Sequence, residues 1–313
     1  MARYLLNRIA GVLAVMLAVS VITFFLMHSV PGGPFDVMNS QHNVNITPEV
    51  MKQLSKLYGL DKPLWQQYLV FLKNAVRLDF GHSLYFPSQS VGEILARQWP
   101  YSIQLGLLTL AFSAVVGGGL GIAAAMNQRT WIDYLGTGVS IFCLATPGFV
   151  LAVLLQIVFA VKLHWVPTGG WDTPQQWVLP VLANSLGPVL ILQRFTRGSV
   201  ADVLGSNYVR TARAKGMPAA TVTFVHIFKN ALTPLITVGG PMVAGIFSGS
   251  LFIESIFRIP GIGGFFVGAA ISRDYPLIMA TTIITTAIIA VAYLVTDLLY
   301  AVVDPRVTFV KES

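Results

Sequence analysis

Long runs of apolar residues separated by polar stretches dominate the chain. A membrane-spanning helix needs about 20 mostly apolar residues, because each residue rises about 1.5 Å through a hydrocarbon core about 30 Å thick. Six stretches without Asp, Glu, Lys or Arg meet this length: Ile9–Phe35, Gln98–Gln128, Tyr134–Val161, Thr173–Gln193, Asn230–Ile253 and Tyr275–Thr296. The pattern predicts an all-α polytopic membrane protein with six transmembrane helices.

Three of these stretches differ from a plain apolar run. The first is longer than the roughly 7–15 apolar residues of a secretory signal and has no A-x-A pattern, so we expect it to stay as a helix. The fourth is the weakest, because Pro180, Asn184 and Pro188 dilute it. The sixth is expected to continue through Asp297 to about Val303.

The composition agrees with a membrane protein. Hydrophobic residues make up 55% of the chain and charged residues only 11%, whereas a soluble domain has about 25% charged residues. This excludes an ordinary soluble enzyme, a disordered protein and a basic nucleic-acid binder. The single cysteine, Cys143, excludes a disulfide framework and a Cys-based zinc site, and no two of the five histidines are spaced as metal ligands on a helix. We therefore predict no metal site.

The lysines and arginines predict the orientation. With the N-terminus inside, the inner segments carry eleven of them and the short outer loops three, so the positive-inside rule places both termini in the cytoplasm. The predicted organisation is an N-terminal transmembrane helix (1–30), an extracytoplasmic segment (31–100) and a five-helix core (101–313).

The extracytoplasmic segment has two helix-start patterns. Thr47-Pro48-Glu49 places a proline at the first helical position and an acid in the first turn, and Asp61-Lys62-Pro63 offers a second start. Apolar residues follow each start at helical spacing. We expect two short amphipathic helices at the outer mouth of the bundle, serving either as a lid or docking surface or simply as packing.

The inner loop between the fourth and fifth spans, at about 199–232, is the most informative polar stretch. Val200, Val203, Leu204, Tyr208 and Thr211 keep helical spacing, Gly216 would end that helix, and Pro218 can open the next. Two short helices joined at Gly216 suit docking to a soluble partner that pushes on the bundle. A DNA-binding helix-turn-helix and an inert loop are the alternatives.

Within this loop, Tyr208-Val-Arg-Thr-Ala-Arg-Ala-Lys-Gly216 resembles the EAA loop of permease subunits of binding-protein-dependent ABC importers. More narrowly, the chain resembles the B-type permeases of the dipeptide/oligopeptide family over nearly its whole length. The other matching segments are Val30-Pro-Gly-Gly-Pro34, Tyr58–Tyr68, Asp79-Phe-Gly-His-Ser83, Pro260-Gly-Ile-Gly263, Arg273-Asp-Tyr-Pro276 and Asp297–Arg306.

The resemblance implies a type I ABC importer permease fold in the plasma (inner) membrane of a prokaryote. The chain would form half of a pathway with a second homologous permease. Two cytoplasmic ATPase subunits would bind ATP and Mg, and an extracytoplasmic substrate-binding protein would deliver di- or oligopeptides. The chain has no G-x-x-x-x-G-K-[ST] phosphate loop, so a nucleotide site of that kind would have to come from another subunit. No cofactor in this chain and no nucleic acid are expected.

Residue by residue, Arg210, Thr211 and Ala212 occupy the E-A-A positions, with arginine in place of glutamate, and Gly216 matches the glycine of the motif. The resemblance implies that Thr211–Pro218 lies in a groove on an ATPase subunit and transmits its closure. The predicted coupling residues are Arg210, Thr211, Ala212, Arg213, Ala214, Lys215, Gly216, Met217 and Pro218.

Glycines and prolines inside the spans have structural and functional interpretations. Gly117/Gly121 and Gly245/Gly249 form G-x-x-x-G pairs, which favour close helix packing in lipid. Prolines interrupt spans three to five, and kinked helices either line a pathway or simply bend. The candidate pathway or hinge residues here are Pro147, Gly148 and Pro241, and the other prolines are Pro180, Pro188 and Pro234.

Three charged residues are further candidates. Asp297 lies near the inner end of the last span, and an intramembrane carboxylate is a functional candidate by default. It would serve a stand-alone secondary carrier, the alternative to the importer, or be a water-facing or paired structural acid. Glu254 and Arg258, at the outer end of span five, are candidates for docking the binding protein, with a solvated rim as the alternative for Glu254. No catalytic constellation is present at a convincing spacing, so we predict no enzyme activity.

Overall fold

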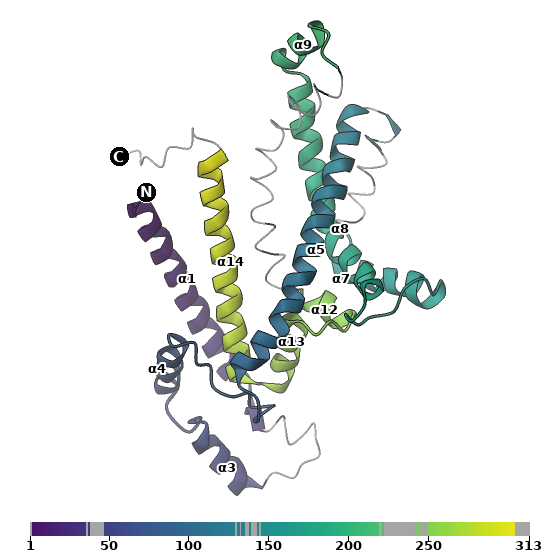
Figure 1. The fold of residues 1–313 in the computed structure, drawn as a ribbon. Coiled ribbons are helices and arrows are strands. Elements are labelled where there is room, and N and C mark those ends of the chain that lie inside the picture. Colours follow the sequence, from purple (N-terminus) through teal and green to yellow (C-terminus); the bar gives the residue numbers. More distant parts are fainter. Residues whose placement is uncertain are drawn as a thin grey trace. The chain divides into compact units, whose positions relative to one another are not determined.

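The computed structural model describes residues 2–35, 37, 47–128, 130–131, 133–134, 138, 143, 145–218, 221, 242, 245 and 250–303. These residues are mostly helical and form no β-strand beyond an isolated bridge. Among them, four helices are long and apolar enough to cross a membrane. They are α1 (Ala2–Ser29), α5 (Val91–Met126), α8 (Pro174–Leu204) and α14 (Tyr275–Val303) (Figure 1).

These four helices confirm the first, second, fourth and sixth predicted spans, with one correction. The fourth span is not interrupted, because α8 runs unbroken for 31 residues through Pro180 and Pro188. Its N-terminus follows Thr173, whose backbone N–H donates to the Gln176 side chain at 2.9 Å. A proline removes one backbone donor, and a long helix in a packed bundle tolerates this loss when neighbours compensate.

The third predicted span contains a helix break at Pro147. Pro147 is the N-cap of α7 (Gly148–Leu155), which continues directly as a π-helix, η1 (Gln156–Lys162). Before this break, Tyr134, Gly138, Cys143 and Ala145 are also helical, and the other positions between 134 and 145 lie outside the described residues. Most of the predicted fifth span, with Pro234, Pro241 and Gly249, lies outside the described residues, and its end forms the short α12 (Leu251–Ile256).

The chain forms two compact units, residues 1–101 with 260–288 and residues 102–259 with 289–313. In the first unit, the two predicted amphipathic helices are confirmed as α3 (Pro48–Leu57) and α4 (Leu64–Ala75). Pro48 is at the first helical position of α3, after an extended Thr47. Gly59 then turns the chain with a positive φ of 67°.

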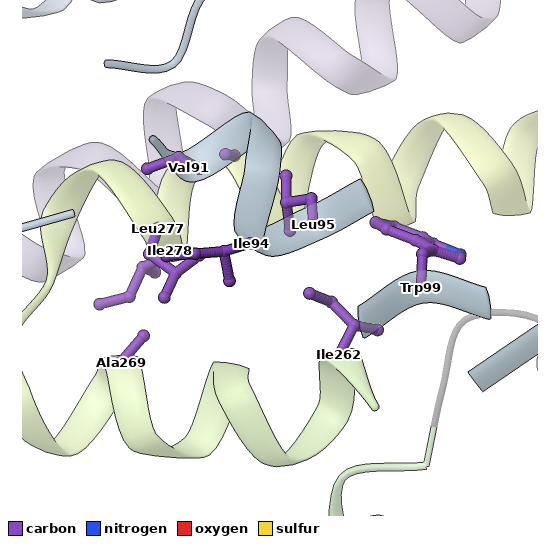
Figure 2. Close-up of a cluster of buried hydrophobic side chains, with 9 residues drawn as sticks. Val91, Ile94, Leu95, Trp99, Ile262, Ala269, Leu277 and Ile278 are labelled. Carbon is purple, nitrogen blue, oxygen red and sulfur yellow. The ribbon is translucent and has the colours of Figure 1, made fainter. Parts of the chain in front are cut away.

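The core of the first unit lies where the start of α5 meets α13 (Ile262–Ser272) and the first turns of α14. Figure 2 shows these side chains converging from the three helices. On α5, Val91, Ile94, Leu95 and Trp99 stand at i, i+3, i+4 and i+8, as one buried helical face requires. The buried members are Val91, Ile94, Leu95, Trp99, Ile262, Ala269, Leu277, Ile278 and Ala280.

In the second unit, α5 packs closely against α8 through two glycines. A Cβ atom on Gly117 would lie 2.7 Å from the Val189 carbonyl oxygen, and one on Gly121 would lie 2.5 Å from Thr196 Cβ. The Asn184 side chain also donates to Thr109 Oγ1 at 3.1 Å. The predicted packing role of the Gly117/Gly121 pair is confirmed, because only glycine permits this approach.

Candidate functional site

The predicted coupling loop forms a short helix beyond the end of α8. The α8 helix ends at Leu204, and α9 (Asn207–Ala214) follows after the Gly205–Ser206 turn. The predicted helix from Val200 to Gly216 is therefore broken. Its first part is the last turn of the membrane helix, and Ser206 ends that part by donating its hydroxyl to the Val203 carbonyl at 2.6 Å. We call residues 205–218 the elbow.

Gly216 ends the elbow helix as predicted, through its backbone. Its φ is +74°, in the left-handed region that residues with a Cβ rarely adopt, and no other atom lies within 4 Å of the position a Cβ would take. The Met217 N–H donates to the Ala212 carbonyl at 3.3 Å, which caps the last turn. The glycine is therefore needed for backbone conformation, and not for space.

One face of the elbow packs on the membrane helices. Val209 and Ala212 form a buried cluster with Ala125 of α5 and Val200 of α8. Ile122, Val203, Leu204 and Met217 pack around this cluster. Spacing of three residues places Val209 and Ala212 on the same side of α9. The elbow thus rests on the ends of two membrane-spanning helices.

The opposite face of the elbow is exposed and polar. Of the nine predicted coupling residues, the exposed ones are Arg210, Thr211, Ala214, Lys215, Gly216 and Pro218. Met217 is half-buried, and the Arg213 side chain lies outside the described residues. Ala212 differs from these residues, because it packs inward and is 6% exposed.

An ion pair lies seven residues before the end of α8. Arg197 donates from Nε and Nη2 to the two carboxylate oxygens of Asp133, at 2.5 and 2.7 Å. Asp133 is buried, and such two-bond pairs fix orientation as well as distance. No local pattern in the sequence indicates this pair, since Asp133 and Arg197 lie 64 positions apart.

Glu254 is not a surface residue. Its side chain has no exposed area, and Oε1 accepts hydrogen bonds from Ser102 Oγ at 2.8 Å and from the Ser250 N–H at 3.2 Å. The predicted docking role and the solvated-rim alternative are both wrong in this structure, because a fully covered carboxylate offers a partner nothing to contact. Arg258 is exposed, with a positive φ of 55°.

The remaining candidates are placed only in part. Pro147 caps α7 and Gly148 begins it, so both lie at a break between helical segments. Pro241 lies outside the described residues. Asp297 is a residue of α14, but the structure does not describe its side chain.

A buried carboxylate in the first unit was missed as a site. Asp274 has no exposed area, and it accepts hydrogen bonds from the Ser83 hydroxyl and from the N–H groups of Leu84 (3.2 Å) and Leu277 (3.3 Å). The neighbouring Arg273 donates to the carbonyls of Pro31 and Gly32. We call this Arg273–Asp274 turn the hub.

The hub joins three segments that the sequence analysis had only noted as matching motifs. Hydrogen bonds join the Arg273–Pro276 motif to the Asp79–Ser83 motif, through Asp274, and to the turn at residues 30–34, through Arg273. Each motif thus matches a part of one hydrogen-bonded assembly. The signal in the sequence was the motifs themselves, but nothing in the sequence alone showed that they meet.

A cavity of about 360 Å³ lies in the first unit beside the hub. It is bounded by the last turns of α1, by α4, by the α3–α4 turn and by the start of α14. Aromatic rings line much of it, including Phe24, Phe71 and Tyr275. Among the described residues, no three His, Cys, Asp or Glu side chains are grouped as metal ligands would be.

Two protein-family models match most of this chain. The family described as "Binding-protein-dependent transport system inner membrane component" matches residues 117–309, and the model of its N-terminal region matches residues 1–105. The chain belongs to this family. The expected resemblance is therefore confirmed, and the elbow, the hub and the long helices are parts of a permease component.

Characterised relatives align over the full length of this permease component. It is 39% identical over 313 residues to the dipeptide transport system permease protein DppB of Bacillus subtilis, with all of both chains covered. It is 37% identical over 311 residues to the oligopeptide transport system permease protein OppB of Escherichia coli K12, covering 99% of this chain and 100% of the relative.

Solved structures support the fold. An inward-facing crystal structure of the MetNI methionine ABC transporter has a TM-score of 0.55 at 12% identity, covering 67% of this permease and 96% of that chain. A crystal structure of an amino acid ABC transporter with histidines has a TM-score of 0.51 at 15% identity, covering 68% and 94%. At these identities the likeness concerns the fold alone.

Membership of this family shows the location of the chain and the other components of its transport system. It is an inner membrane component with several apolar helices, part of a system that also has a binding protein and a separate ATPase subunit. These findings favour an importer permease over a stand-alone secondary carrier built on Asp297.

Proposed function

We propose that this chain is one of two permease subunits of an ATP-driven importer of dipeptides or oligopeptides. Support for the substrate comes from relatives, named as dipeptide and oligopeptide permeases, that align over nearly the whole chain. A second homologous permease completes the pathway. An extracytoplasmic binding protein delivers the peptide, two cytoplasmic ATPase subunits bind ATP and Mg, and both termini of this chain lie in the cytoplasm.

One observation carries the coupling part of the proposal: α9 has a buried face and an exposed face. The buried face is held by Val209 and Ala212 on the ends of α5 and α8. The exposed face carries Arg210, Thr211 and Lys215. An ATPase subunit that grips the exposed face therefore moves two membrane helices with it.

The arrangement suggests how ATP drives transport. When the ATPase pair closes on ATP, the elbow moves with the subunit that holds it, and α5 and α8 follow because they share a core with α9. The bundle then opens outward to accept peptide. The helix break at Pro147-Gly148 and the residues Pro241 and Asp297 stay candidates for the pathway or hinge, and exposed Arg258 for docking the binding protein.

Gly216 offers a test of the coupling. Replacing it with valine forces a β-branched residue into a left-handed backbone, which should displace the elbow. In proteoliposomes that contain the whole transporter, Gly216→Val should hydrolyse ATP with little uptake of a labelled dipeptide or oligopeptide. Gly216→Asn is the matched control, because asparagine tolerates this backbone and should keep most uptake.

Two outcomes would contradict separate parts of the proposal. Normal uptake per ATP in Gly216→Val would contradict the coupling role of the elbow. Failure of the unmodified transporter to take up any peptide, with ATP-driven uptake of another solute, would contradict the substrate and leave the coupling intact.

A further inference from the structure

The helix α4 meets the membrane helix α1 far from the end of α1. The hydroxyls of Tyr68 and Ser20 lie 2.7 Å apart, and the rings of Tyr68 and Phe24 are 5.3 Å apart. The Ser20 hydroxyl already donates to the Leu17 carbonyl at 2.8 Å. Since a hydroxyl has one hydrogen to donate, Tyr68 is the donor to Ser20.

The position of this contact along α1 gives its depth. The apolar span of α1 is Leu6–Ser29, and Ser20 lies nine residues before its end. At about 1.5 Å per residue this is about 13 Å, close to half of a hydrocarbon core about 30 Å thick. The Tyr68 side chain therefore reaches α1 within the leaflet nearest to the C-terminal end of α1, and not above the membrane.

The outer surface of α4 suits that depth. Trp65, Leu69, Leu72 and Val76 recur at i, i+4, i+7 and i+11, which places them in one stripe. Trp65 is 60% exposed, Leu69 54% and Val76 86%. The only charged residue of α4, Lys73, follows Leu69 by four residues and borders this stripe, where a long lysine side chain can reach the lipid headgroups. On a helix in water such a stripe would be costly, at about 25 cal/mol per Å² of apolar surface.

Two comparisons indicate what covers the stripe. On α1, Ser20 and Phe24 are buried towards α4, while Ile22 and Leu26 are exposed, as side chains of a membrane-spanning helix against lipid are. The stripe on α4 extends the same kind of apolar surface at the same depth. By contrast α3 carries three charged residues in ten, as a helix in water does.

We propose that α4 lies in one leaflet of the bilayer, with the Trp65–Leu69–Val76 stripe against lipid acyl chains. Amphipathic helices with tryptophan on the apolar side bind membranes in this way. The helix anchors the segment 31–100 to the lipid, whereas the sequence analysis had expected a lid, a docking surface or packing at the mouth of the bundle. This inference depends on α1 crossing the membrane and not on which solute is transported.

The test measures the surroundings of Leu69 in the intact transporter. A nitroxide is attached to Leu69→Cys in a Cys143→Ser background, with the whole complex reconstituted in phosphatidylcholine–phosphatidylglycerol vesicles. Collision with oxygen, which concentrates in lipid, is compared with collision with a water-soluble nickel chelate. Phe25→Cys on α1 is the lipid reference, and Gln53→Cys, an exposed position on α3, is the water reference.

The expected result is that Leu69 behaves like Phe25, with oxygen collision above nickel collision, and that the ratio inverts at Gln53. Labels at Trp65→Cys and Val76→Cys should follow Leu69. If the label at Leu69 collides mainly with nickel, the stripe faces water and the proposal is wrong. Protection from both reagents would equally overturn it, because a protein partner would then cover the stripe. Both outcomes leave the proposed peptide import unaffected.

Discussion

The hub and the elbow are held by opposite kinds of interaction. At the hub, a buried carboxylate takes hydrogen bonds from a segment 191 residues away, and an arginine binds carbonyls of the turn at residues 30–34. At the elbow, a short helix rests on small apolar side chains of α5 and α8 and keeps its charged face exposed. Directional bonds fix the hub in one geometry, whereas non-directional packing leaves the elbow a free face.

This difference suggests that the hub and the elbow have different mechanical roles. A buried carboxylate with several donors is costly to disrupt, because each donor that loses its partner costs about 1–3 kcal/mol. Contacts among alanine and valine are individually weaker and adapt to small shifts. A segment that must stay in place suits the first kind of support. A segment that must pass movement to a partner suits the second.

The largest effect is expected at the hub. Asp274→Ala should lower the free energy of unfolding by about 3 kcal/mol or more, because it leaves the Ser83 hydroxyl and the Leu84 and Leu277 N–H groups without an acceptor. The measurement is thermal unfolding of the purified chain in mild detergent. Ser83→Ala is the control, since it leaves Asp274 its backbone N–H donors and removes only one donor to the carboxylate and the acceptor of the Phe86 N–H, so it should cost less, about 1–2 kcal/mol. Equal losses in the two variants would show that Asp274 is not the centre of the assembly.

A smaller effect is expected where α5 packs on α8, below the elbow. A methyl group at Gly121 would meet Thr196 Cβ at 2.5 Å and the Gln193 carbonyl at 2.7 Å. Gly121→Ala should therefore cost about 1–3 kcal/mol, as overpacking does. Gly118→Ala is the matched control on the same helix, with no other atom within 4 Å of its Cβ position, and should be neutral. Detergent unfolding compares the two, and similar stabilities would refute the close α5–α8 contact.

The sequence predicted these elements to different degrees. Charge-free length identified α1, α5, α8 and α14, because the lipid core demands it, and the proline and acid at Pro48-Glu49 identified α3. The same rule does not register the helix break at Pro147 within the third span. It also treated Pro180 and Pro188 as interruptions, although α8 continues through both.

Those features of the candidate site that depend on neighbouring residues in the sequence were predicted. The elbow was recognised from nine neighbouring residues, and Gly216 from the stop it imposes on a helix. The inward orientation of Ala212 depends in part on Ala125 of α5, which lies far away in the sequence. Glu254 was misplaced for the same reason, because its partner Ser102 lies 152 residues away. No local pattern distinguishes such a buried acid from one at a water-facing rim.

The central claim is that the exposed face of the elbow contacts an ATPase subunit. Its most direct test places a photo-reactive benzoylphenylalanine at Tyr208 or at Val209 in the assembled transporter. These neighbours point about 100° apart on α9, with Tyr208 45% exposed and Val209 fully buried. We predict a cross-link to the ATPase subunit from position 208, and cross-links only within the chain from position 209. Absence of an ATPase cross-link from position 208 in a transporter that still imports peptide would contradict the account.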